Sequence, residues 1–258
     1  MNSPFNDPDQ LEKDIQDFIN RFRATVRIHG KRMSDYFEMT CFNKIVRFYE
    51  LKEYTVEVRN LKRKEYRYKC SPAGIYSNFS FFEASISNSE GTFKYEIHHN
   101  LAVQSSHNKD IFTTPDITVI ISRKAKTTKK YYDSGVRFSY VKNLDCLTFC
   151  EAKQLPPFPE LLFNFIGIVN ELKKEYMTND GFPHNPVHIA PSLMISGIPN
   201  KQTSRIKMYL EERYCINILF DLYHTGSNIF SKNQVSKLRI AGKNKSANPN
   251  NKGKLLSK

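Results

Sequence analysis

Long apolar runs, paired cysteines and nucleotide-binding loops are all missing from this sequence of 258 residues. The longest apolar stretch, 161–169, is far shorter than the about 18 residues of a membrane-spanning helix. The five cysteines form no CxxC pair, and such an odd set is typical of reduced thiols. The chain has neither a GxGxxG motif nor a Walker loop, which argues against an ATPase or a dinucleotide enzyme. We therefore expect a cytoplasmic protein without a membrane span or a disulfide framework.

Acidic residues are absent from positions 231–258, although this segment holds eight basic residues. Residues 1–230 carry 31 basic and 26 acidic residues, so most of the formal net charge of +13 belongs to the end of the chain. The segment also lacks the apolar spacing of a core element, which predicts a flexible basic tail. We expect a single domain over 1–230 with its core at 34–224. Positions 1–10 contain no basic residue, which argues against a targeting peptide.

Hydrophobic periodicity and turn residues predict the order of the elements. Apolar residues three and four apart predict a helix at 9–28, a second helix from the N-cap Ser34 to about 50, and a third at 159–177. A fourth helix is expected at 200–214, after Asn200 as its N-cap. Strands are expected at 54–58, 78–86, 92–104, 117–121, 144–153, 190–196 and 216–223, with a turn or hairpin at 59–69 and an inserted basic hairpin at 123–143. This order predicts an α/β fold with a mixed central β-sheet flanked by helices.

Two short motifs supply three charged residues suited to phosphodiester hydrolysis. Glu151 and Lys153 are two apart at the end of the strand expected at 144–153, so their side chains share one face. Asp116 follows Pro115 and opens the apolar strand at 117–121. If the two strands pair, both carboxylates converge on one cation, and such oxygen ligands with open positions suit Mg²⁺. Lys153 would then orient the attacking water or help to deprotonate it.

The literal strings Pro115-Asp116 and Glu151-Ala-Lys153 resemble both halves of the signature of the PD-(D/E)XK nuclease superfamily. The resemblance is close at these motifs and loose over 34–200. The 34 residues between Asp116 and Glu151 are a long spacing for that family, and the inserted hairpin accounts for them. The resemblance implies a restriction-endonuclease-like fold and a Mg²⁺-dependent endonuclease in which Mn²⁺ can replace Mg²⁺. Asp116 and Glu151 would be metal ligands and Lys153 a catalytic residue.

Members of that family often add an acidic residue from the helix before the sheet, and Glu38 is our candidate. Glu38 falls on one stripe of its helix with Phe42 and Ile45. A carboxylate in an apolar stripe is costly unless it has a partner or a metal. Glu96, on the strand-like run before Asp116, stays open as the alternative.

Contacts with nucleic-acid phosphates are expected from the basic hairpin, beside which we place Asp116: Lys124, Lys126, Lys129 and Lys130. Gln154, directly after Lys153, is a further candidate for contact with phosphate or water. The tail at 231–258 is either a phosphate-binding arm or a solubilising terminus. His98 and His99 are neighbours on a strand and face opposite ways, so they cannot both ligate one metal.

Two functional hypotheses follow from the sequence. The first is a metal-dependent nuclease, acting on DNA rather than RNA, in host defence or DNA processing; cutting both strands would call for two sites, as in a homodimer. The second is a catalytically inactive module of the same fold that binds nucleic acid or a protein partner. The motif residues can also be interpreted without any function. Glu151 and Lys153 would then be a solvated pair on an edge strand, and Asp116 a turn residue. Binding of Mg²⁺ or Mn²⁺ separates the hypotheses, since only the enzyme requires it.

Overall fold

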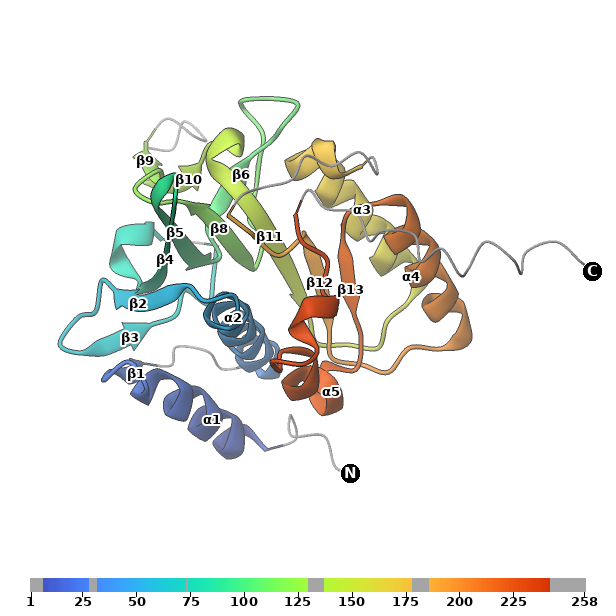
Figure 1. Cartoon of the computed structure of the whole chain (residues 1–258), viewed down its shortest axis with the longest axis horizontal. Coiled ribbons are helices and arrows are strands. Elements are labelled where there is room, and N and C mark those ends of the chain that lie inside the picture. The colour runs from blue at the N-terminus through green and yellow to red at the C-terminus, as the bar shows by residue number, and fades with distance from the viewer. Residues whose placement is uncertain (1–6, 28–31, 73, 130–136, 178–185, 242–258) are drawn as a thin grey trace, which may run out of the picture.

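The computed structural model describes residues 7–27, 32–72, 74–129, 137–177 and 186–241. A central sheet runs through the molecule, with helices against both of its faces (Figure 1). The helices are α1 (Pro8–Asn20), α2 (Met33–Leu51), α3 (Pro159–Lys173), α4 (Lys201–Arg213) and α5 (Leu222–Ile229). The strands are β1 (Thr25–Arg27), β2 (Thr55–Arg59), β3 (Glu65–Arg67), β4 (Phe81–Asn88), β5 (Gly91–His99), β6 (Ala102–Gln104), β7 (Phe112–Thr113), β8 (Ile117–Ile121), β9 (Lys126–Thr128), β10 (Phe138–Val141), β11 (Cys146–Lys153), β12 (Ser192–Ile195) and β13 (Asn217–Leu219). Among the described helices, none is long and apolar enough to cross a membrane.

The central sheet has seven strands in the order β13-β12-β11-β8-β5-β4-β2. β11, β12 and β13 are parallel neighbours, and α3 and α4 supply the crossovers that parallel pairing requires. β8 is antiparallel to both β5 and β11. The predicted mixed α/β sheet flanked by helices is therefore confirmed, and the strands that carry the two motifs are adjacent.

The two faces of the sheet pack into two separate cores. Ile117 and Cys150 belong to the core formed with α1, α2 and α5. Ile120 and Phe149 belong to the core formed with α3 and α4. Both strands thus alternate between the two cores, as the side chains of a buried strand must. The site residues lie where this doubly covered strand pair reaches its end.

A smaller sheet of order β7-β6-β10-β9 lies beside the central one. Its strands β9 and β10 pair antiparallel, which confirms the inserted hairpin predicted at 123–143. Lys130 falls within 130–136, outside the described residues. Strand β10 also pairs with β6, so the hairpin is fixed to the chain that follows β5.

The N-terminal helix ends earlier than the spacing of its apolar residues predicts. α1 stops at Asn20 rather than 28, because Arg23 adopts a left-handed backbone with a φ of 57°. Val26 fits the helical spacing but lies in β1, opposite Tyr66 of β3. Because that partner is distant in sequence, local periodicity could not reveal the strand. α2 matches its prediction, although its N-cap is Arg32 instead of Ser34.

The C-terminal part of the prediction needs two corrections. The strand expected at 216–223 ends at Leu219, and α5 follows a left-handed turn at Asp221. The tail expected from 231 is wrong for 231–241, because Val235 and Leu238 are buried and Ile240 bridges to the chain before β12. Isolated apolar residues in a basic segment give no periodic signal, which is why the packing was missed. Residues 242–258 lie outside the described residues.

Candidate active site

Asp116, Glu151 and Lys153 form one cluster at the end of β8 and β11. The Lys153 Nζ donates to Glu151 Oε2 at 2.7 Å and to Asp116 Oδ2 at 3.0 Å. Asp116 Oδ2 also accepts a hydrogen bond from the backbone N–H of Ala152 at 2.7 Å. The carboxylates are largely buried, whereas a third of the Lys153 side chain is exposed. The predicted convergence of these three residues is therefore present in the fold.

Strand register explains why residues 35 positions apart in sequence meet. Ile117 lies opposite Cys150, so Asp116 is one residue beyond the last pair and reaches the Ala152 N–H. Because Cys150 and Ala152 point into the core under α2, alternation turns Glu151 and Lys153 to the opposite face. The strand therefore presents carboxylate and ammonium side by side.

Burial and like charge together perturb the acid–base chemistry of the cluster. Burial, and then the negative charge of Asp116, raises the pKa of Glu151 from 4.5 to about 7, although Lys153 opposes the rise. Burial lowers the pKa of Lys153, but the charges of Glu151 and Asp116 outweigh it, and the net pKa is raised. Lys153 is therefore charged at neutral pH, while Glu151 changes protonation close to neutrality.

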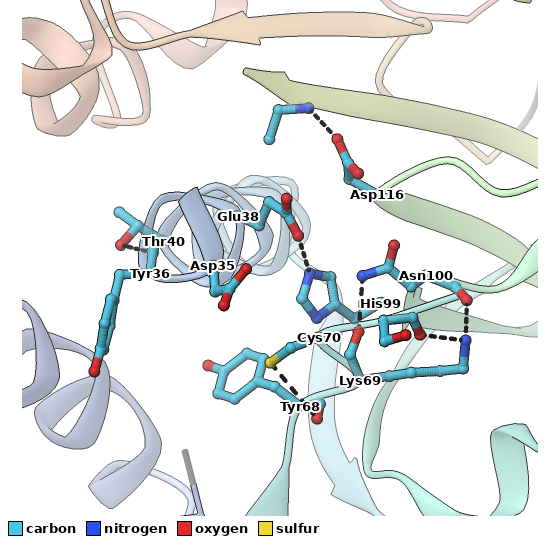
Figure 2. A network of polar contacts seen from close by, with 12 residues as sticks. Asp35, Tyr36, Glu38, Thr40, Tyr68, Lys69, Cys70, His99, Asn100 and Asp116 are labelled. Carbon is cyan, nitrogen blue, oxygen red and sulfur yellow. Dashed lines mark hydrogen bonds and ion pairs between the residues drawn. The ribbon is translucent and has the colours of Figure 1, made fainter. Parts of the chain in front are cut away.

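Glu38 approaches the same region from α2. Its side chain leaves the helix on the side that faces His99 and Asp116 (Figure 2). Glu38 Oε2 is 3.7 Å from His99 Nε2, an ion-pair distance rather than a hydrogen bond. The imidazole of His99 is buried, and neither of its ring nitrogens has a hydrogen-bond partner among the described residues. Glu38 thus has His99 as its neighbour.

The donor set fits a hard divalent cation held by two protein ligands. Asp116 and Glu151 offer carboxylate oxygens, and the pKa of Glu151 is raised partly because a second negative charge stands nearby. Mg²⁺ needs only one or two carboxylates when substrate phosphate and water complete its shell. No three His, Cys, Asp or Glu residues in the described parts of the chain are grouped to hold a metal. The structure thus brings together Asp116 and Glu151, and it does not join Glu38 to them as a ready third ligand.

Glu96 is engaged elsewhere. Its carboxylate accepts from His98 Nε2 at 2.9 Å, from Ser122 Oγ at 3.1 Å and from the Arg123 N–H at 2.8 Å. Although burial raises its pKa, these hydrogen bonds bring the net pKa below the usual value. Glu96 pairs with Ile120, about 13 Å along β8 from Asp116 at ~3.3 Å per residue. It therefore has a structural role with His98 and is no metal ligand beside Asp116.

Sequence reasoning missed the support beneath Asp116. The carbonyl oxygen of Asp116 accepts from the Asn100 N–H at 2.9 Å, and Asn100 has a left-handed φ of 53°. The buried Lys69 Nζ donates to the carbonyl oxygens of Asn100, Ser71 and Pro72 at 2.6, 2.8 and 2.8 Å. Figure 2 shows Lys69 reaching back to Asn100. Burial lowers the pKa of Lys69 to about 8, and three carbonyl dipoles are its compensation. Lys69 thus fixes the turn that holds the Asp116 backbone.

Gln154 points away from the cluster. Its Nε2 donates to the hydroxyl of Tyr223 on α5 at 2.9 Å, and the Tyr223 ring lies edge-on to Phe37 of α2. Gln154 therefore ties the end of β11 to two helices, a partner that the sequence did not indicate.

The expected role of the hairpin lysines as phosphate contacts assumed that they lie beside Asp116. The described lysines follow the other end of β8 instead. Asp116 precedes β8, whereas Lys124 and Lys126 follow the opposite end of that strand. The five residues of β8 span about 17 Å, so Asp116 and these lysines are separated by about that length of strand. Lys124, Lys126 and Lys129 are all exposed, which leaves them accessible to an extended partner.

Comparisons of the chain with protein families, with curated proteins and with solved structures yield no match.

Proposed function

We propose that this protein is a metal-dependent nuclease that hydrolyses phosphodiester bonds in nucleic acid and has a restriction-endonuclease-like core. The observation that carries the proposal is the cluster of two buried carboxylates within 3.0 Å of one Lys153 ammonium. The resemblance of both motifs to the PD-(D/E)XK signature supports it, as does their position on adjacent strands. The preference for DNA over RNA rests on that resemblance.

The chain's own residues have separate tasks in this proposal. Asp116 and Glu151 would bind the divalent cation through carboxylate oxygens, and Glu151 must lose its proton to do so. The cation would neutralise negative charge on the phosphate during hydrolysis. Lys153 would turn its ammonium from the carboxylates to the attacking water and the phosphate. Water adds to phosphorus, the bond to one ester oxygen breaks, and that oxygen takes up a proton.

A pKa of about 7 for Glu151 suits this assignment. Near neutral pH an incoming cation displaces the proton at little cost, because the two acidic groups already repel each other. Lys153 keeps its charge, since both carboxylates raise its pKa. The exposed third of its side chain gives the ammonium access to a ligand in solvent.

The second candidate is a binding module without catalysis, and one observation favours it. Lys153 satisfies both carboxylates directly, so the cluster is a closed ion network that needs no cation. Such networks can be purely structural, and perturbed pKa values alone do not establish an active site.

Cleavage assays distinguish the two candidates. Plasmid DNA, linear DNA and RNA are each incubated at pH 8 with Mg²⁺, with Mn²⁺ and with EDTA. The nuclease should cut at least one of them only with metal, and Asp116→Asn should lose both metal binding and cleavage. Lys153→Met should bind Mn²⁺ yet cleave at least about 100-fold more slowly, because loss of proton transfer or orientation by one group costs that much.

Glu160→Gln is the matched control, because Glu160 is an exposed carboxylate at the start of α3. Binding of nucleic acid without cleavage of any substrate in either metal would favour the module. Full activity in the Lys153→Met protein would place the active site elsewhere.

A further inference from the structure

A cavity of about 290 Å³ lies between α1, α2 and α5, on the side of α2 that faces α1. α1 and α2 each line it with residues of one face, such as Ile15 and Phe18 or Lys44 and Arg47, and α5 contributes Ser227. Apolar wall residues are Ile15 and Phe18 from α1 and Phe230 after α5. Polar groups come from Asn43 and Lys44 of α2. The cavity therefore combines apolar walls with a charged group, which is the usual composition of a small-molecule site.

Lys44 is the charge in this cavity that has no direct partner among the described residues. In the part of the chain that the structure describes, its ammonium has no hydrogen-bond or ion-pair partner. Burial lowers its pKa, whereas the nearest acidic groups, the Cys41 thiol and Asp14, oppose this too weakly to cancel it. A partly buried ammonium without a counter-charge is costly, so an anion placed against it would be bound favourably.

Gly226 of α5 provides the room for this ammonium. A Cβ atom at position 226 would stand 2.7 Å from both Cε and Nζ of Lys44, closer than atoms can approach. Any other residue would therefore push Lys44 out of its place. The close approach of a lysine to a helix backbone shows that the position of Lys44 is built by two helices together.

The other charges around the cavity are largely paired. Arg21 and Arg47 both contact Glu50, at 2.5 and 3.1 Å. Asp14 accepts a hydrogen bond from Gln10. Arg21, Lys44 and Arg47 thus face only two carboxylates, Glu50 and Asp14, so positive charge around the cavity exceeds negative charge by one.

We propose that this cavity binds a small organic anion. Its anionic group would contact Lys44, and its apolar body would lie against Ile15, Phe18 and Phe230. A volume of about 290 Å³ suits a single small molecule rather than a polymer. A phosphate ester and a carboxylate share this chemistry, and the experiment separates them. The proposal is independent of the nuclease assignment, because it concerns other residues and a metal-free measurement.

Calorimetric titration of the full-length protein in EDTA tests it. The probes are adenosine 5′-monophosphate and hexanoate, each compared with its neutral counterpart, adenosine or hexanol, and with inorganic phosphate. At least one organic anion should bind at one site, more tightly than its neutral counterpart and than phosphate. Lys44→Met and Gly226→Ala should each weaken that binding at least tenfold, while Lys13→Met, an exposed lysine of α1, should leave it unchanged.

Thermal unfolding supplies a second readout that does not depend on Gly226→Ala folding. Lys44→Met should unfold at a higher temperature than the unliganded native protein, because it removes a poorly compensated charge. The same organic anion should raise the unfolding temperature of the native protein and not that of Lys44→Met. Absence of binding by both organic anions, equal binding to Lys44→Met, or phosphate binding as tight as theirs would each overturn the proposal.

Discussion

Replacing Glu151 with glutamine should change how stability depends on pH. Folding raises the pKa of Glu151 from 4.5 to about 7, so the folded protein holds this proton more tightly than the unfolded chain. The associated stability is fully present below pH 4.5 and is lost as the pH rises through 7. The difference between the two pKa values corresponds to about 3 kcal/mol of unfolding free energy. Glutamine does not titrate, so the unfolding free energy of the variant should not fall in this way as the pH rises.

The assay is urea unfolding at pH 4.5 and pH 8 in EDTA. Other titrating groups contribute to the unfolding free energy of both proteins. Their contributions cancel when the value for the native chain is subtracted from that for Glu151→Gln. That difference should change by about 3 kcal/mol in favour of the variant as the pH rises. Glu160→Gln, which alters an exposed carboxylate, should show no such change. A difference between Glu151→Gln and the native protein that is independent of pH would refute the reasoning.

Three further predictions follow from the same structure. Lys153→Met should raise the pKa of Glu151 further, since the ammonium lowers it, and the pH dependence of urea unfolding should move upward accordingly; an unchanged midpoint would contradict this. Lys69→Met should lower the unfolding free energy by about 3 kcal/mol, because three backbone carbonyls, among them that of the buried Asn100, lose their donor, whereas Lys109→Met at an exposed site should have no effect in the same assay. A chain ending at residue 241 should keep its stability, and one ending at 230 should lose about 4 kcal/mol or fail to fold, because the buried side chains of Val235, Leu238 and Ala241 are removed; equal unfolding of both would contradict the observed packing.

Elements with strong local signals could be predicted from the sequence. β8 has the predicted bounds, 117–121, because four of its five residues are β-branched and apolar and Pro115 and Ser122 bound the run. α2 and α3 carry long apolar stripes and were predicted nearly in full. β1 and α5 were missed, because a three-residue strand and a helix of eight residues depend on distant partners rather than on their own periodicity.

Some residues of the candidate site could likewise be predicted from the sequence, and others could not. Asp116, Glu151 and Lys153 could be found because the motif strings fix their spacing within each strand, and strand pairing then brings them together. Lys69 could not be found, because its three acceptors are backbone carbonyls that only the folded chain assembles. Glu38 was chosen for its place in an apolar stripe, and its observed neighbour is His99.

The central claim is that Asp116 and Glu151 together hold one divalent cation. Its most direct test is calorimetric titration with Mn²⁺ at pH 6 and pH 8, each in two buffers of different ionisation enthalpy, which counts the protons released per ion bound. A Glu151 pKa of about 7 predicts one Mn²⁺ per chain, with release of about 0.9 proton at pH 6 and about 0.1 at pH 8. Glu151→Gln should bind no ion under the same conditions. Absence of Mn²⁺ binding to the native protein, or binding with equal proton release at both pH values, would contradict the claim.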